Sequence, residues 1–223
     1  MPRRLRSDVP GPDWRVPLAA LRDPGPDGIF PPRLPRPLAL VVDVGFGRGE
    51  LLQELARAHP ERAYLGIEYS SKRVLKMTRR IAKTEIDNVR LVEATAEAAV
   101  AELAPASVLG FWVNFPDPWP KKRHHRRRLL QAPFVRAIAD HLVPGGFLEV
   151  ATDHEEYAAW IHEVLLAEPR LENRAAPLPF RREPPPRLAT AYELEWRAQG
   201  RSAHYFSYAR TADEETAGAM GSR

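Results

Sequence analysis

The chain has 223 residues, 44% of them hydrophobic, which is enough to bury a substantial core, and we expect one domain with appendages. It contains no cysteine, so disulfides, thiolate zinc sites, iron–sulfur clusters and cysteine nucleophiles are excluded. The net charge is +4, and no apolar segment follows the basic start at residues 1–6, so we expect a cytoplasmic protein without a secretory signal or a membrane span.

The first 37 residues are rich in proline. They contain ten of the 23 prolines and show neither a helical nor a strand period. This composition predicts an extended arm. Its seven arginines and four aspartates make it mildly positive, so contact with a polyanion and an inert tail are both open.

From residue 38 onward, apolar runs of strand length alternate with helical stretches. The predicted strands are 38–44, 63–68, 89–93, 108–114 and 147–152. The predicted helices are 50–59, 70–84, 96–103, 127–142 and 154–167. This repeated βαβ alternation predicts a doubly wound, mostly parallel, Rossmann-like α/β sheet, with a ligand crevice beyond the carboxyl ends of its strands.

The region after residue 168 is less regular. A proline-rich stretch covers residues 177–186, a short helical signal follows, and an apolar run at 203–209 is typical of a closing edge strand. We therefore place the main domain at residues 38–210, after the arm at 1–37 and before a tail at 211–223.

A glycine-rich turn joins the first predicted strand to the first helix. Asp43 precedes Gly45, Gly47 and Gly49, and glycines let the backbone approach a ligand closely at a helix N-terminus. Glu68, at the end of the second strand, is spaced to hold ribose hydroxyls. The acids and the G-x-G-x-G spacing favour cationic, phosphate-free S-adenosylmethionine, with a nicotinamide cofactor as the alternative. In the purely structural interpretation, the glycines only form a tight turn and Glu68 caps the next helix.

Residues 114–128, NFPDPWPKKRHHRRR, are the most informative part of the chain. Prolines at 116, 118 and 120 fix φ on alternate residues and disfavour helix before each, which predicts defined positions for Asp117 and Trp119. Trp119 either stacks on a base or packs against the core, and packing is the commoner role of a tryptophan.

The basic segment, residues 121–128, follows directly. Its six Lys and Arg carry +6 while the whole chain carries +4, so the remaining residues carry −2. A local patch on a near-neutral body predicts directed binding of a nucleic acid, and a solvated helix start is the alternative. The expected phosphate contacts are Lys122, Arg123, Arg126, Arg127 and Arg128.

With the motifs at 43–49, 66–68, 114–125, 151–153 and 190–193, in that order, the chain resembles the bacterial tRNA (guanine-N7-)-methyltransferases over roughly residues 38–210. The element at 116–124, PDPWPKKRH, is close to diagnostic of that family. The resemblance implies a class I methyltransferase fold, S-adenosylmethionine as methyl donor, and a variable-loop guanosine at position 46 of tRNA as the acceptor that becomes 7-methylguanosine. We expect neither a metal nor a second protein subunit.

The resemblance also assigns residues. Cofactor contact is implied for Asp43, Glu68 and Asp117, and substrate contact for Lys121, Asp153, Thr190, Ala191, Tyr192 and Glu193. Thr95 stands where the family often has Asp or Asn facing the adenine, and whether Thr95 or Glu97 takes that role is open. Residues 152–155 and 190–193 also fit S/T-x-x-E capping boxes, which need no function.

Guanine N7 carries a lone pair and no proton, so methyl transfer to it needs no general base, and positioning dominates the rate. Asp117 is therefore predicted to accept hydrogen bonds from guanine N1 and N2 and to stabilise the cationic purine. A non-catalytic RNA-binding protein and a nicotinamide-dependent oxidoreductase are the alternatives, and binding of S-adenosylmethionine distinguishes them.

Overall fold

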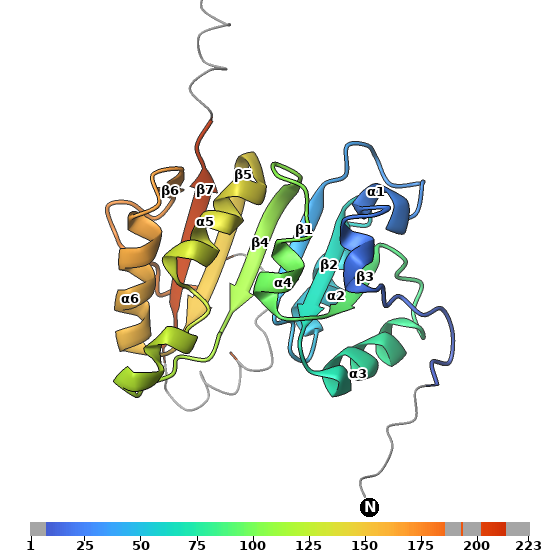
Figure 1. Cartoon of the computed structure of the whole chain (residues 1–223), viewed down its shortest axis with the longest axis horizontal. Helices are drawn as coiled ribbons and strands as arrows, with labels where there is room; N and C mark the ends of the chain where they lie inside the picture. Colours follow the sequence, from blue (N-terminus) through green and yellow to red (C-terminus); the bar gives the residue numbers. More distant parts are fainter. Residues whose placement is uncertain (1–7, 186–192, 194–201, 213–223) are drawn as a thin grey trace, which may run out of the picture. The chain divides into compact units, whose positions relative to one another are not determined.

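The structure is a computed structural model that describes residues 8–185, 193 and 202–212. The chain forms two compact units, Met1–Ala104 and Pro105–Arg223. The described residues contain three strands in the first unit and four in the second (Figure 1). No helix within these residues is long and apolar enough to cross a membrane.

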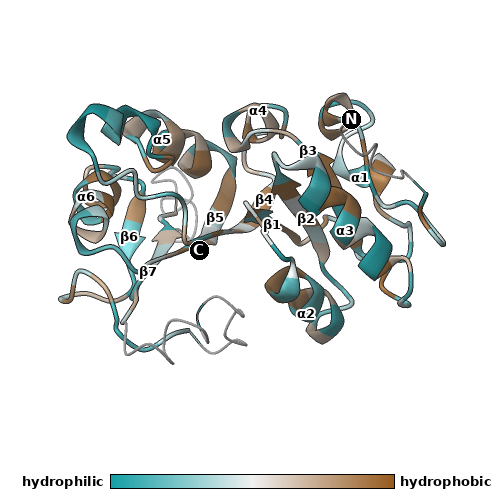
Figure 2. Cartoon of the chain, turned by 90° about the horizontal axis from the view of Figure 1, so that it is seen from below, coloured by the Kyte–Doolittle hydropathy of each residue, from teal (hydrophilic) through white to brown (hydrophobic). Residues whose placement is uncertain are grey.

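The first unit is built on three parallel strands, with β2 between β1 and β3. The strands are β1 (Leu40–Val44), β2 (Ala63–Glu68) and β3 (Val89–Glu93). Every residue of β1 and β2 is buried, as expected for strands covered on both faces. Right-handed crossovers from β1 through β2 to β3 place both connecting helices on one face (Figure 2). The helices are α2 (Glu50–Ala58), α3 (Ser71–Ile81) and, after β3, the short α4 (Ala96–Val100).

Residues 8–37, predicted as an extended arm, pack onto this unit. They form a 3₁₀ helix, η1 (Leu18–Leu21), and a short helix, α1 (Pro26–Ile29). Before them, the backbone pairs with β3, because Val16 N donates to Leu91 O (2.9 Å) and Leu91 N donates to Trp14 O (3.0 Å). The sequence did not predict this packing. A proline-rich segment shows no hydrophobic period, even where its backbone pairs with the edge of a sheet.

Arg90 of β3 holds the arm in place. Its guanidinium lies 4.6 Å from the ring centroid of Trp14 and 5.1 Å from that of Phe30, and its Nε donates to Ile29 O (2.6 Å). Burial lowers the pKa of Arg90, and the two rings and the carbonyls offset the lost hydration of its charge.

The four arginines in the described part of the arm all pair with carboxylates. The pairs are Arg15–Asp13, Arg22–Glu102, Arg33–Asp87 and Arg36–Asp27. The described part of the arm also has four aspartates, so the excess positive charge of the arm comes from Arg3, Arg4 and Arg6, which lie outside the described residues.

The second unit carries a mixed sheet in the order β4-β5-β7-β6, in which β4 and β5 are parallel and β7 is antiparallel to both neighbours. The strands are β4 (Val108–Asn114), β5 (Leu142–Thr152), β6 (Leu171–Asn173) and β7 (His204–Arg210). The helices are the 3₁₀ helix η2 (Lys122–Arg127), α5 (Ala132–His141) and α6 (Glu155–Leu166), and α5 and α6 lie on one face of this sheet (Figure 2).

Two elements of the second unit differ from prediction. The strand expected to close the sheet, β7, pairs on both sides, and the edge is β6, whose three residues are too few to show a period. The helix predicted at 127–142 begins at Ala132, because residues 122–127 form η2 and Arg128 is extended, with ψ of 133°.

Candidate functional site

The glycine-rich turn follows β1. Gly45, Gly47 and Gly49 have φ of +70°, +57° and +76°, a region that residues with a side chain rarely adopt. A Cβ on Gly45 would meet no atom within 4 Å, whereas a Cβ on Gly49 would lie 2.3 Å from the sulfur of Met77 in α3. Gly45 therefore leaves the backbone open to a ligand, and Gly49 allows α3 to pack against the turn.

Glu68, predicted to hold a ribose, also braces this turn. Its side chain is 1% exposed, its Oε2 accepts from Gly47 N (3.2 Å) and its Oε1 accepts from Ser70 N (3.0 Å). The guanidinium of Arg73 lies 3.5 Å from Oε2. One carboxylate thus joins the end of β2, the glycine turn and the start of α3, and its remaining lone pairs are the ones that a ligand can use.

Asp43 and Thr95 are the other first-unit residues that the sequence assigned to a cofactor. Asp43 is buried in β1, opposite Gly66 of β2. Thr95 caps α4, because its side-chain oxygen accepts from Ala98 N (3.3 Å), and Glu97 lies in the first turn of the same helix. Asp43, Thr95 and Glu97 therefore belong to the same unit as the glycine turn.

In the second unit, Asp117 lies exposed on the turn after β4. Phe115 and Trp119, two residues to either side, have φ of +51° and +44°. Such a backbone costs on the order of 1–3 kcal/mol for a residue with a side chain, so the surroundings must enforce it. One constraint is the bond from Phe115 N to Ala151 O (2.8 Å). The turn therefore holds an exposed carboxylate on a constrained backbone.

Trp119 packs against the basic segment. Its ring meets the ring of His124 edge-on at 5.7 Å between centroids, and the guanidinium of Arg127 lies 5.0 Å from its centroid. These contacts connect the proline-rich turn to the cations that follow it.

Arg128 differs from the prediction of a phosphate contact, because its side chain is only 1% exposed. Its Nε donates to Pro118 O (2.9 Å), and its terminal nitrogen lies 3.0 Å from both Glu156 Oε1 and His125 Nε2. It is therefore a positioning residue that ties the turn carrying Asp117 to α6.

The rings of Tyr157 and Trp160 in α6 lie 5.0 Å and 5.3 Å from the Arg128 guanidinium. Hydrogen bonding from Arg128 holds the pKa of Glu156 below its usual value. The sequence held no signal for this role, because six neighbouring cations look alike until packing buries one of them.

Five cations of the basic segment are exposed around η2. In a 3₁₀ helix, side chains three residues apart align, which places Arg123 and Arg126 on the same side. The exposed members are Lys121, Lys122, Arg123, Arg126 and Arg127.

Asp153 is half-buried between β5 and α6. Residues 152–155 do not form the capping box that their sequence also fits, because His154 is the N-cap of α6 and its Nδ1 accepts from Tyr157 N (3.2 Å). Thr152 instead accepts from His154 N (3.3 Å) and supports the cap. Asp153 is thus held between two residues with fixed local bonds.

Within 190–193 the structure describes Glu193; Thr190, Ala191 and Tyr192 lie outside the described residues. Glu193 is buried, and its Oε1 accepts from the hydroxyl of Tyr205 in β7 (2.9 Å). This bond fixes the orientation of the carboxylate that the sequence assigned to the substrate.

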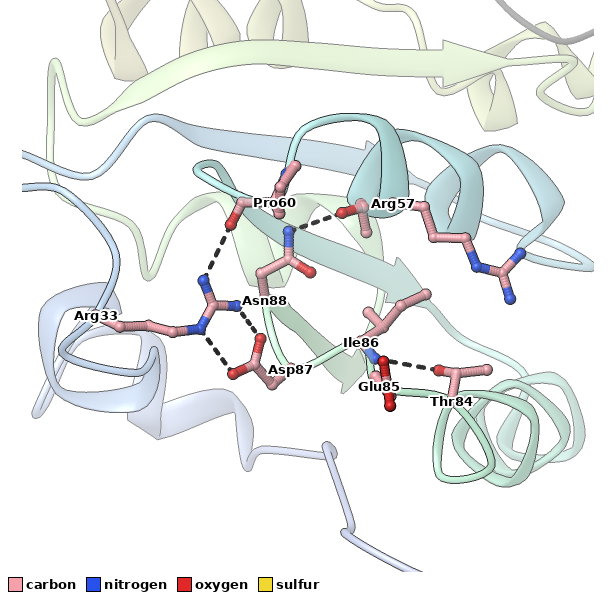
Figure 3. A pocket seen from close by; sticks show the side chains of 9 residues that line it. Arg33, Arg57, Pro60, Thr84, Glu85, Ile86, Asp87 and Asn88 are labelled. Atoms are coloured by element: carbon pink, nitrogen blue, oxygen red, sulfur yellow. Dashed lines mark hydrogen bonds and ion pairs between the residues drawn. The ribbon is translucent and has the colours of Figure 1, made fainter.

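The first unit also has a pocket of about 370 Å³ near the amino ends of β2 and β3 (Figure 3). The Nδ2 of Asn88 donates to the carbonyls of Ala56 (3.1 Å) and Arg62 (3.0 Å), and Arg33 pairs with Asp87. The Arg33 guanidinium holds the pKa of Asp87 below its usual value. The glycine turn lies at the opposite, carboxyl end of β1, so this pocket is not part of the candidate cofactor site. In the described ranges no group of three or more His, Asp or Glu could hold a metal ion.

Two solved structures have a similar fold. The aminoglycoside resistance methyltransferase NpmB1 aligns with a TM-score of 0.55 and 18% identity over 78% of this chain and 87% of its own. The antibiotic-resistance methyltransferase Kmr aligns with a TM-score of 0.57 and 19% identity over 79% and 88%. The seven-stranded, mostly parallel α/β fold with an antiparallel β7 is that of the class I methyltransferases.

A family model described as "Putative methyltransferase" matches residues 38–206. The tRNA (guanine-N(7)-)-methyltransferase of Halorhodospira halophila is 41% identical over 82% of this chain and 78% of its own length. The enzymes of that name from Thiobacillus denitrificans and Alkalilimnicola ehrlichii are 45% and 47% identical over 67% and 69% of this chain, which spans 65% and 64% of their lengths. The chain belongs to the tRNA (guanine-N7-)-methyltransferase family.

Proposed function

We propose that the chain transfers a methyl group from S-adenosylmethionine to N7 of a variable-loop guanosine in tRNA, giving 7-methylguanosine. Membership of the family supports the reaction class. The observation that carries the finer proposal is Asp117, an exposed carboxylate between two strained residues, followed directly by five accessible cations.

The first unit has features that suit the cofactor. The open approach to Gly45 and the acids Asp43 and Glu68 fit a ligand with ribose hydroxyls, an amino group and a sulfonium. Thr95 already accepts a bond as a helix cap, so Glu97 is the better acceptor for the amino group of adenine. When bound, S-adenosylmethionine would supply an electrophilic methyl group.

The second unit has features that suit guanine. Guanine presents hydrogens on N1 and N2, and the carboxylate of Asp117 accepts both in our proposal. The purine becomes cationic as N7 is alkylated, and a fixed carboxylate lowers the energy of that charge. Its backbone position is set before the substrate arrives, so less ordering is needed in the reaction. A contact of Asp117 with the cofactor, implied by the family resemblance, belongs to the same proposal.

Phosphate binding is proposed for the exposed cations of the basic segment, which grip the RNA backbone without distinguishing bases. Lys121, Asp153 and residues 190–193 are proposed to contact the substrate nucleotide. Because the substrate is tRNA, we propose action in the cytoplasm, and the purified chain should be active without a second protein subunit.

The test is incubation of the purified chain with tRNA and labelled S-adenosylmethionine, followed by digestion to nucleosides. Labelled 7-methylguanosine is expected, and changing the variable-loop guanosine to adenosine should abolish it. Adenine has no N1 hydrogen, so Asp117 would lose a bond at a cost of about 1–3 kcal/mol. A methyl group on another atom, or comparable methylation of the adenosine variant, contradicts the proposal.

Two alternatives predict different binding. A non-catalytic RNA-binding protein would bind tRNA but not S-adenosylmethionine, and a nicotinamide-dependent oxidoreductase would bind a dinucleotide at the glycine turn. Calorimetric titration of the chain with each cofactor separates the three functions.

A further inference from the structure

The positive charge of the chain is concentrated in two segments, of which the proposed function uses one. Residues 71–84 contain six Lys and Arg and no acid, and residues 121–128 also carry +6, so the rest of the chain carries −8 within a net charge of +4. The five lysines of the chain occur only in these two segments, at positions 72, 76, 83, 121 and 122. The segment around α3 therefore equals the basic segment in charge.

Three lysines of this segment lie on α3 and on the turn that follows it, and we call them the lysine stripe. Lys72 and Lys76 are four residues apart on α3, a spacing that returns to one side of a helix, and Lys83 lies in the turn, two residues after Ile81. All three are exposed, and none has an ion-pair partner within the described residues. In Figure 2 much of α3 is coloured teal, the colour of hydrophilic residues.

A second stripe on the same helix holds the glycine turn. Arg73 lies 3.5 Å from Glu68, Met77 packs against Gly49, and the guanidinium of Arg80 donates to the carbonyl of Arg48 (2.8 Å). These three residues are four and three positions apart, so α3 faces the turn along one side and presents Lys72 and Lys76 on another. Lys72 and Lys76 are therefore connected to the candidate cofactor turn through a single helix.

Exposure to solvent alone explains the charge of α3 poorly. The first turn of α3 has no acid and contains Lys72, a cation at the end of the helix where the helix dipole favours an anion. Lys72 and Lys76 are like charges at i and i+4, which destabilises a helix by a few tenths of a kcal/mol. The other described helices of nine residues or more, α2, α5 and α6, contain acids. A polyanion bound along the lysine stripe would offset both the unfavourable dipole interaction of Lys72 and the repulsion between Lys72 and Lys76.

We propose that the lysine stripe, on α3 and the turn after it, is a second contact surface for the phosphates of tRNA. The inference rests on the proposed function, which supplies a folded RNA as substrate. An RNA backbone fits a set of neighbouring point charges because it presents phosphates continuously, while the net −8 of the remaining chain repels it elsewhere. Lysines binding phosphate add affinity and register without reading bases.

The first test is a triple variant, Lys72→Gln, Lys76→Gln and Lys83→Gln. The slope of log Kd for tRNA against log salt should fall by about two to three, because each lost phosphate contact removes roughly 0.9 from it. Affinity for S-adenosylmethionine should not change, since the residues that hold the turn are intact. The matched control, Arg22→Gln, Arg57→Gln and Arg62→Gln, removes the same charge from other faces of the first unit and should leave the slope unchanged.

The second test uses the unmodified chain. Acetylation of lysines with and without tRNA, measured by mass spectrometry, should show protection of all three stripe lysines together with Lys121 and Lys122. Protection confined to Lys121 and Lys122, or an unchanged slope in the triple variant, overturns the inference while the proposed function stands. Failure of the unmodified chain to form 7-methylguanosine counts against the proposed function instead.

Discussion

The glycine turn of the first unit and the Asp117 turn of the second both follow a buried strand and both contain residues with positive φ. In the glycine turn these residues are glycines, and the acid that serves the turn, Glu68, is buried and held by backbone amides. In the other turn they are Phe115 and Trp119, and the acid, Asp117, is exposed.

In the proposed function, the difference follows from what each turn presents to its ligand. A turn that offers its backbone to a small cofactor gains from having no side chains, and glycine reaches left-handed φ without strain. A turn that offers side chains to RNA needs Cβ atoms, so its unusual φ angles must be imposed by neighbours. The bond from Phe115 N to Ala151 O and that from Arg128 to Pro118 O are such constraints.

The largest expected effect tests the exposed acid. Asp117→Ala should slow methyl transfer by roughly two to three orders of magnitude, as expected when a fixed electrostatic contact to the developing charge is lost. Binding of tRNA should stay nearly intact, because the cations proposed to bind phosphate lie in residues 121–127 and are unchanged. Single-turnover rates and tRNA affinity measure the two effects.

Glu163→Ala, which removes an exposed carboxylate from α6, is the control for Asp117→Ala and should retain full activity. Near-normal turnover of Asp117→Ala would remove this residue from the proposed chemistry.

The buried acid should behave differently. In Glu68→Gln, one of the two backbone N–H donors, from Gly47 or Ser70, would face the amide nitrogen in place of an oxygen. We expect the free energy of unfolding to fall by about 1–3 kcal/mol, together with weaker binding of S-adenosylmethionine. Urea denaturation and calorimetric titration measure both.

The exposed Glu61→Gln is the comparison for Glu68→Gln, since surface ion pairs contribute little. If Glu68→Gln proves as stable as Glu61→Gln, the hydrogen bonds from Glu68 to the glycine turn and to α3 do not contribute to the stability of the fold.

Two neighbouring arginines, Arg126 and Arg128, are expected to have different roles beside the Asp117 turn. Arg128→Gln should lower the free energy of unfolding by about 1–3 kcal/mol and slow methyl transfer, because a buried, hydrogen-bonded cation is lost. The salt slope of tRNA binding should not change. Arg126→Gln should do the reverse, reducing the slope by about one with no loss of stability. Equal effects of the two substitutions would contradict the division between a positioning arginine and a phosphate contact.

The smallest effect concerns pH. Burial lowers the pKa of His204 below the ordinary value of 6.5, with a further contribution from Arg182 and opposing ones from Thr152, Glu155 and Asp153. As pH falls below about 6.5, the unfolded chain binds a proton before the folded one, so the free energy of unfolding should decrease. In His204→Phe this part of the decrease should be absent when unfolding is compared at about pH 7.5 and pH 5.5.

Sequence reasoning identified most elements from their periods. The strands 63–68, 89–93 and 108–114 agree with β2, β3 and β4. It missed β6, which is too short to show a period, and the packing of residues 8–37, where proline conceals the pairing with Leu91. It left a capping box at 152–155 open as an alternative and did not find the histidine N-cap, because histidine lies outside the usual set of capping residues.

The sequence by itself determined which chemistry is available: glycines at alternate positions, an acid between prolines, and two cationic segments in a chain without cysteine. It determined this because backbone freedom, proline geometry and charge belong to residue types. Only the tertiary structure decided which groups are used internally. Arg128 is buried against α6 while Arg126 is exposed, and Glu68 braces the glycine turn while Asp117 faces solvent. Burial and partners depend on contacts between segments distant in sequence, and these contacts exist only in the folded chain.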